Sequence, residues 1–178
     1  MAQDTQQMNG HGHIDLAQFG DWYLNCDFVI HPEPYTGFAP VYEVDRDRYI
    51  NHVELAIARD VPTYIIDYLE QCFTNLSDKV YAMHRTRPGK LLPWHTDAYK
   101  TYAQKRSITD LSQITRVIIF AEEWKFGHVM QVGTESVPAW QQGDWVSWQG
   151  STPHLAANLG QQDRYTLQIT GITNVKQS

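Results

Sequence analysis

The chain has 178 residues and a formal net charge of −6, and 42% of its residues are hydrophobic. This length fits a single domain with a substantial core, and the acidic balance disfavours a nucleic-acid-binding surface, which is normally basic. No apolar run approaches the roughly 18 residues of a membrane span, so we expect neither nucleic acid nor a membrane as a partner.

The two cysteines, Cys26 and Cys72, lie far apart in the sequence. This spacing fits neither a disulfide framework nor a thiolate zinc site. Residues 1–10 contain no apolar core of a signal peptide. We therefore expect two reduced thiols and a cytoplasmic protein.

The N-terminal part predicts a polar arm followed by mainly helical structure. Residues 1–13 are polar and rich in Gln and Gly, so we expect a flexible arm there. The remainder, 14–178, is expected to form one domain, in which residues 14–76 are a helical support. A short helix is expected within 14–25, and the prolines of 28–42 favour a loop or an edge strand.

Two longer helices are expected before residue 77. In residues 45–58 the apolar side chains Tyr49, Ile50, Val53 and Ile57 recur at helical spacing. Pro62 suits the first turn of a second helix, which we expect to end near Phe73.

The C-terminal part, residues 77–178, is expected to form a β-barrel core. Short β-prone segments alternate there with turn signals such as Gln142-Gly143-Asp144. The predicted strands are 80–85, 115–120, 129–132, 145–148 and 165–172. The predicted fold class is therefore mainly β with N-terminal helices, with an all-β barrel or sandwich as its core.

Two His-x-Asp pairs are candidate metal ligands. His13 and Asp15 lie beside the polar arm, where an adventitious role is the better interpretation. His95 and Asp97 lie in the β-rich part, and in an extended segment residues two apart point to the same side. The alternative for this second pair is a surface histidine and an aspartate that caps a turn.

His154 and Arg164 extend the second pair into a possible site. Two histidines and one carboxylate can hold Fe(II) on one face and leave positions open, although Mn, Co or Ni could use the same ligands. A turn at 158–162 would place His154 and Arg164 on neighbouring strands. Arg164 could then hold a small dicarboxylate beside the metal; its alternative is a surface ion pair.

The order of His95-x-Asp97, His154 and Arg164 resembles the Fe(II)- and 2-oxoglutarate-dependent dioxygenases, over residues 80–172. That family has a double-stranded β-helix, a jelly-roll barrel like that of cupins. Residues 140–164 are also similar to the aspartyl/asparaginyl β-hydroxylase-like branch, because Gly143-Asp144-Trp145 precedes the distal histidine and Asn158 follows it. Members of that branch can lack the carboxylate that Asp97 supplies here.

The resemblance implies the cofactors and the roles of five residues. His95, Asp97 and His154 would hold Fe(II), Arg164 would pair with the C5 carboxylate of 2-oxoglutarate, and Thr166 would add a hydrogen bond. With O2, the enzyme would hydroxylate a C–H bond of a small molecule, an amino acid or a peptide side chain and release succinate and CO2. The presence of Asp97 favours hydroxylation over halogenation.

Further residues are candidates for substrate binding or for the core. Arg116 and Arg85 lie on predicted strands, and Trp94 and Trp148 could wall the site, with a solvent-facing or core position as the alternative for each. His84 and His128 have no partner at ligand spacing, and we expect them to be structural.

Two other functions fit the same residues. One is a cupin-like metal enzyme that does not use 2-oxoglutarate. The other is a non-catalytic β-barrel binding module.

Overall fold

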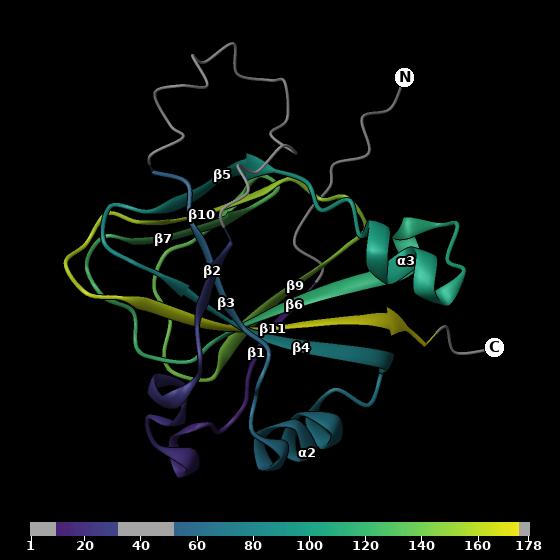
Figure 1. The fold of residues 1–178 in the computed structure, drawn as a ribbon, viewed down its shortest axis with the longest axis horizontal. Coiled ribbons are helices and arrows are strands. Elements are labelled where there is room, and N and C mark those ends of the chain that lie inside the picture. Colours follow the sequence, from purple (N-terminus) through teal and green to yellow (C-terminus); the bar gives the residue numbers. More distant parts are fainter. Residues whose placement is uncertain (1–9, 32–51, 175–178) are drawn as a thin grey trace.

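The computed structural model describes residues 10–31 and 52–174, and in them the chain forms two antiparallel sheets with two α-helices and three short 3-10 helices (Figure 1). The larger sheet has the order β1 (Gly10–His13), β9 (Asp144–Gln149), β6 (Ile114–Phe120), β11 (Arg164–Thr173), β4 (Leu76–Thr86), β3 (Leu55–Ala58), β2 (Val29–His31). The smaller sheet has the order β5 (Leu91–His95), β10 (His154–Asn158), β7 (His128–Val132), β8 (Glu135–Val137). The α-helices are α2 (Thr63–Cys72) and α3 (Lys100–Arg106), and the 3-10 helices are Ala17–Phe19, Trp22–Asn25 and Leu111–Gln113. The mainly β fold class is thus confirmed.

The larger sheet is covered on one face by α2 and the N-terminal 3-10 helices. Ile65 and Leu69, four positions apart on α2, are fully buried against this face, as expected for the apolar stripe of an amphipathic helix. Burial of each contributes roughly 1.5–3 kcal/mol. The sheet residues of this core are Ala58, Leu76, Met83, Val117, Ile119, Leu167 and Ile169.

The other face of the larger sheet looks toward the smaller sheet. A second core lies there, formed by Ile118, Phe120, Val146, Trp148, Met130, Val132, Trp140 and Ala156. Every residue of β6 is buried, which explains the apolar run over residues 117–120, because a strand covered on both faces needs no polar side there.

β11 uses the two faces differently. Leu167 and Ile169 enter the core under α2, whereas Arg164, Thr166 and Gln168 line a cavity between the sheets. The period of two along the strand therefore separates an apolar face from a polar one. This polar face is what positions the site described below.

The N-terminal expectation differs from the structure at residues 10–13. They form β1, which pairs with β9 from Gly10 opposite Ser147 to His13 opposite Asp144. The absence of a side chain at Gly12 admits the indole of Trp145, which would lie 2.7 Å from a Cβ atom there. A polar composition is no obstacle at an edge strand, because the backbone supplies the pairing. Residues 1–9 lie outside the described part.

The helix expected over residues 45–58 is wrong for all of its described residues, because Val53 forms an isolated bridge with Leu91 and the last four residues form β3. Ala56 and Ala58 are buried, whereas Leu55 and Ile57 line the cavity. This alternation has a period of two, which the helical spacing of the longer window concealed. Residues 45–51 lie outside the described part.

Other expected elements are found with small differences. α2 begins after Pro62 and ends before Phe73, as predicted. Within the stretch 28–42, residues 29–31 form β2, the last strand of the larger sheet, whereas residues 32–42 lie outside the described part. The helix expected within 14–25 is two 3-10 turns. The support predicted over 14–76 is thus not purely helical, because it contains β2 and β3. Neither α-helix of the described residues has the length and apolar character needed to cross a bilayer.

Candidate metal centre and ligand cavity

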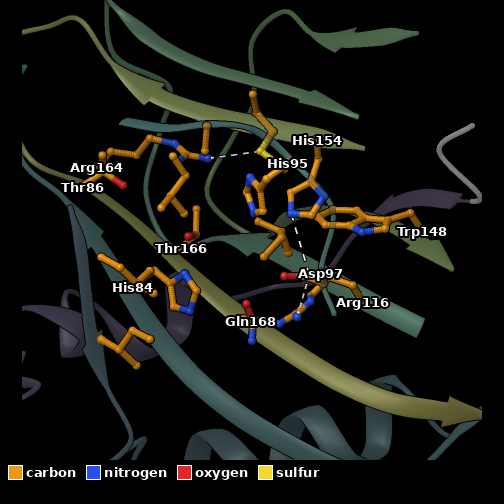
Figure 2. A pocket seen from close by; sticks show the side chains of 16 residues that line it. His84, Thr86, His95, Asp97, Arg116, Trp148, His154, Arg164, Thr166 and Gln168 are labelled. Carbon is orange, nitrogen blue, oxygen red and sulfur yellow. Dashed lines mark hydrogen bonds and ion pairs between the residues drawn. The ribbon is translucent and has the colours of Figure 1, made fainter. Parts of the chain in front are cut away.

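A cavity of about 200 Å³ lies between the two sheets (Figure 2). The smaller sheet and the segment after β5 contribute Leu92, His95, Asp97, Met130, His154 and Ala156. The larger sheet contributes Leu55, Ile57, His84, Thr86, Arg116, Ile118, Trp148, Arg164, Thr166 and Gln168. The wall is therefore mixed, with polar groups converging between apolar patches, as in many small-molecule sites.

The predicted ligands His95, Asp97 and His154 come together at one side of this cavity. His95 ends β5 and His154 begins β10, and the two are directly paired in the antiparallel ladder. Their ring centroids are 4.2 Å apart. One potential ligand atom from each of the three residues lies within 4.8 Å of the others. The structure thus brings together three residues for which the sequence had shown only the order along the chain.

Backbone hydrogen bonds fix the tautomer of both histidines. Nδ1 of His95 donates to the carbonyl of Pro93 at 2.6 Å, and Nδ1 of His154 donates to the carbonyl of Thr152 at 2.9 Å. Each Nε2 then carries the lone pair, which is the state that a metal ligand requires. Trp148 packs on the His154 ring, with 4.6 Å between ring centroids.

Asp97 is held by Arg116. The Arg116 guanidinium donates to Oδ2 of Asp97 at 2.7 Å, and the same oxygen lies 3.7 Å from Nε2 of His154. Arg116 also lies over the ring of Tyr99 at 5.1 Å. The predicted substrate arginine is therefore a cavity residue whose first partner is a candidate metal ligand.

The pKa shifts keep this cluster ready for a cation. Burial lowers the pKa of His95. The pKa of His154 is lowered to about 4, mainly by burial and to a smaller extent by the nearby His95. Burial alone would raise the pKa of Asp97, but the charged guanidinium of Arg116, with smaller contributions from His154 and His95, outweighs burial and brings the value to about 2. Neutral imidazoles and an ionised carboxylate are the protonation states that bind metal.

These residues fit a divalent metal ion. Two imidazoles with oriented Nε2 atoms and one carboxylate are the donor set of a 2-His-1-carboxylate site, which leaves coordination positions open. The same donors accept several first-row metals, so the residues favour this class of ion without selecting iron.

Arg164 lies at another wall of the same cavity and is 3% exposed. Its guanidinium donates to Sδ of Met130 at 3.6 Å and lies over the rings of Trp140 and Phe120, at 5.5 and 6.0 Å. Its Nε has no hydrogen-bond partner, and no carboxylate in the described part of the chain forms an ion pair with it. A buried charge is normally paired, so this one is suited to an anionic ligand.

The environment of Arg164 supports this interpretation. Burial lowers its pKa to about 10, and Glu122 partly opposes the shift. Glu122 itself pairs with Lys125 and accepts from the backbone N–H of Tyr165 at 3.0 Å. Glu122 therefore acts at a distance and leaves the guanidinium facing the cavity.

The expected relation between His154 and Arg164 differs from the structure. The two residues were expected on neighbouring strands, but β10 belongs to the smaller sheet and β11 to the larger one. The turn between them carries the chain from one sheet to the other, so His154 and Arg164 form opposite walls. Asn158 shapes this turn by donating to the carbonyls of Thr86 and Gln162, at 2.8 and 2.7 Å.

The other predicted site residues divide into two groups. Thr166 and Trp148 are buried and line the cavity. Arg85 and Trp94 do not line it. Arg85 lies on the opposite face of β4, over Phe28 and 3.9 Å from Asp163, because it alternates with the cavity residues His84 and Thr86.

Sequence reasoning missed three polar residues of the cavity, which are Thr86, Gln168 and His84. Gln168 continues the series of Arg164 and Thr166 at a period of two, and this signal was available in the sequence. His84, expected to be structural, also lines the cavity and lies opposite Thr166 in the β4–β11 ladder. His128 does have structural contacts, since its Nε2 lies 3.2 Å from the carbonyl of Gln162.

The first His-x-Asp pair does not form a cluster of this kind. Nδ1 of His13 pairs with Asp144 at 2.8 Å, whereas Asp15 accepts from the backbone N–H of Ala17 at 3.2 Å. The preference for the second pair therefore agrees with the geometry.

No protein-family model matches the sequence, and a search of curated protein sequences finds no significant match. Among solved structures, an oxidoreductase of the 2OG-Fe(II) oxygenase family from Burkholderia pseudomallei is similar with a TM-score of 0.53 and 11% identity, over 90% of this chain and 82% of that chain. A predicted oxalate decarboxylase from Thermotoga maritima has a TM-score of 0.45 and 12% identity, over 84% and 95% of the two chains. A protein with a double-stranded β-helix domain from Klebsiella pneumoniae has values of 0.37 and 15%, over 56% and 72%. At these identities the similarity concerns the fold: the chain has a fold like that of a 2OG-Fe(II) oxygenase family protein.

Proposed function

We propose that the protein is an Fe(II)- and 2-oxoglutarate-dependent oxygenase that hydroxylates a C–H bond of a small molecule, an amino acid or a peptide side chain. The observation that carries the proposal is a buried Arg164 without an ion-pair partner in the described residues, in the same cavity as His95, Asp97 and His154. A cluster of three metal-binding side chains alone would fit many enzymes, but a buried guanidinium in the same cavity also favours binding of a carboxylate.

The fold proposed for this activity is the double-stranded β-helix. Two antiparallel sheets that face each other across the cavity support it, as does the similar fold of the Burkholderia pseudomallei protein. The spacing of ten residues from His154 to Arg164, with Asn158 between them, supports a relationship of this chain to the aspartyl/asparaginyl β-hydroxylase-like branch.

Each residue of the chain would have a defined task. His95, Asp97 and His154 would hold the metal, with the two imidazoles oriented by the carbonyls of Pro93 and Thr152. Bound Fe(II) would supply the redox chemistry: 2-oxoglutarate would be oxidised by O2 to give succinate and CO2, and this oxidation would be coupled to hydroxylation of the substrate.

The larger sheet would bind and orient the cosubstrate. Arg164 would make a planar, two-point contact with its distal carboxylate, and Thr166, two residues along the same face of β11, would add a hydrogen bond. Arg116 would keep Asp97 in place. Trp148 and the apolar wall of Ile118 and Met130 would exclude water from the reacting groups.

An anaerobic titration of the metal-free protein with Fe(II) and then 2-oxoglutarate tests this function. A chelated 2-oxo acid gives a visible metal-to-ligand charge-transfer band, which we expect in the parent protein. Asp97→Ala should lose the metal and the band, whereas Arg164→Met should keep the metal and need far more 2-oxoglutarate.

The outcomes separate the alternatives. Metal binding without a band would reject 2-oxoglutarate and favour a cupin-like metal enzyme. Absence of metal binding would reject the cluster and leave a non-catalytic binding module.

A further inference from the structure

Two polar side chains of the cavity have no role in the proposed binding of metal and cosubstrate. His84 on β4 lies opposite Thr166 on β11, and Gln168 follows two residues later on the same face. Such diagonal neighbours on a sheet lie about 7–8 Å apart, so one small ligand can touch both. Figure 2 shows both on the far side of Thr166 from Arg164, below the rings of His95 and His154.

Neither side chain is satisfied by another residue that the structure describes. Nε2 of His84 is buried there without a hydrogen-bond partner, and the half-buried Gln168 amide makes no hydrogen bond to a described residue. An unmade hydrogen bond at a buried group costs about 1–3 kcal/mol. Such groups persist mainly where a ligand or a water completes them.

His84 is suited to donate a hydrogen bond while it remains neutral. Burial lowers its pKa to about 3, and the charges of Arg116 and Arg164 act in the same direction, with Asp97 opposing them. A neutral imidazole offers one N–H, and the Gln168 amide offers two more. Leu55 and Ile57 of the adjacent β3 provide an apolar wall beside these donors.

The charge of the cavity indicates what those donors receive. Arg116, Arg164 and Asp97 are the ionised residues of its lining, and together they leave one positive charge. A divalent metal raises this excess to three, and the dianion 2-oxoglutarate lowers it to one. A buried excess charge favours a ligand of the opposite sign, and a carboxylate is the anion that accepts N–H donors from two sides.

We propose that His84 and Gln168 bind the carboxylate of the prime substrate, which is a small carboxylic acid of the size of a free amino acid. This inference rests on the proposed function, because the charge excess counts the metal and 2-oxoglutarate. It assigns Arg164 and Thr166 to the cosubstrate and the opposite end of the same polar face to the substrate.

Histidine signals in NMR spectra can test the inference without turnover. The protein, with its histidines labelled with 15N, is loaded with Zn(II), which is diamagnetic, and with 2-oxoglutarate. The His84 ring signals are assigned by their loss in His84→Gln. Free L-amino acids are then added one at a time, and the primary amides of those that bind serve as controls without a carboxylate.

We expect at least one amino acid to shift the His84 signals with saturation, and its amide to bind at least ten-fold more weakly. Dissociation constants come from ligand-observed titrations. His84→Leu and Gln168→Met should each raise the constant for the amino acid at least ten-fold and change that for 2-oxoglutarate less than three-fold. His84→Gln, which keeps an N–H donor, should restore much of the affinity. Arg85→Gln, on the outer face of the same strand, should change neither constant.

Other outcomes would overturn the inference. Equal binding of acids and amides would reject the carboxylate. Weakening of 2-oxoglutarate by His84→Leu to the extent caused by Arg164→Met would place His84 in the cosubstrate site. If 2-oxoglutarate binds and no amino acid does, the substrate class is wrong and the proposed function stands. If 2-oxoglutarate itself does not bind, both proposals fail.

Discussion

Arg164 is a side chain whose surroundings are incomplete without a ligand. Its guanidinium contacts a thioether and two aromatic rings, and no carboxylate of the described residues pairs with it. Aromatic faces and sulfur compensate only part of the lost hydration. The part of the desolvation free energy of Arg164 that these contacts leave uncompensated would be offset by a bound carboxylate.

The first prediction concerns the shape of this cation. Arg164→Lys keeps the charge but loses the planar fork, so we expect the dissociation constant of 2-oxoglutarate to rise about ten-fold. Arg164→Met removes the charge as well, and the rise should reach about 100-fold, since hydrogen bonds to charged groups contribute about 1.5–3 kcal/mol. The measurement is the anaerobic titration of the charge-transfer band. A lysine variant that binds as tightly as the parent would contradict the two-point contact.

The second prediction concerns the same residue without ligands. Because burial lowers the pKa of Arg164 to about 10, its charge opposes folding in the ligand-free protein. Arg164→Met replaces it with an apolar chain of similar length, so we expect the free energy of unfolding to rise by about 1–3 kcal/mol. Urea unfolding of the metal-free proteins measures this, with Arg85→Met on the outer face of β4 as the matched control. A less stable Arg164→Met would mean that its contacts with Trp140 and Phe120 outweigh the desolvation.

At the scale of elements, the turn between β10 and β11 links the two halves of the site. β10 begins with the candidate metal ligand His154, and β11 begins with Arg164. Between them Asn158 is fully buried, and its Oδ1 accepts from the backbone N–H of Gly160 at 3.0 Å. Together with its two donated bonds, this side chain joins the turn to the end of β4.

The third prediction follows from these bonds. Asn158→Ala removes the side-chain partner of the buried Thr86 carbonyl and of the Gly160 N–H, and leaves the Gln162 carbonyl with the His128 contact alone, so we expect a loss of about 2–4 kcal/mol in the free energy of unfolding. Because Arg164 follows the turn directly, the affinity for 2-oxoglutarate should fall while Zn(II) binding is retained. Calorimetric titrations of both ligands measure this. Leu159→Ala, at a neighbouring side chain that is 69% exposed, is the control and should change neither. An unchanged 2-oxoglutarate affinity in a destabilised Asn158→Ala would show that the turn does not position Arg164.

Sequence patterns predicted the elements whose local residue pattern agrees with their final structure. β6 and β11 carry runs of β-prone residues, and α2 has an apolar stripe behind a proline. β5 was not predicted, because Pro93 interrupts it; the strand tolerates proline as an edge of the smaller sheet. β3 was predicted as helix, because its pairing with β4 outweighs the local spacing of apolar residues.

The candidate site was predictable where its residues form a motif along the chain. His95 and Asp97 share one face of an extended segment, and His154 and Arg164 were added by their order. His84 and Gln168 meet only through the register of β4 against β11. Register depends on pairing with a distant strand, so no spacing along the sequence brings these two residues together.

At the scale of the whole molecule, the protein buries several imidazoles in neutral form. Burial lowers the pKa of His84 to about 3 and that of His154 to about 4, and it also lowers those of His95 and His128. The same groups titrate near 6.5 in an unfolded chain. The unfolded state therefore binds more protons as the pH falls below about 6.5, and folding stability decreases.

The fourth prediction is a pH profile of the metal-free protein. Above pH 7 the imidazoles are neutral in both states and impose no cost. From about pH 6.5 down toward 4, each should remove up to about 1.4 kcal/mol per pH unit, because the folded state excludes the proton that the unfolded state takes up. Glu122 acts oppositely, since burial raises its pKa, but it is one carboxyl against four imidazoles.

Urea unfolding with a chelator at pH 7.5, 6.5 and 5.5 measures the slope. Each of His84→Gln and His128→Gln removes one titrating group, so each should flatten the profile by up to one proton. When the chelator is replaced by Zn(II), the pH profile of stability should become steeper, because metal binding also requires neutral histidines. Equal stability at pH 7.5 and 5.5 would mean that these imidazoles take up protons in the folded state. The candidate ligands His95 and His154 would then not be the neutral imidazoles that the proposed metal site requires.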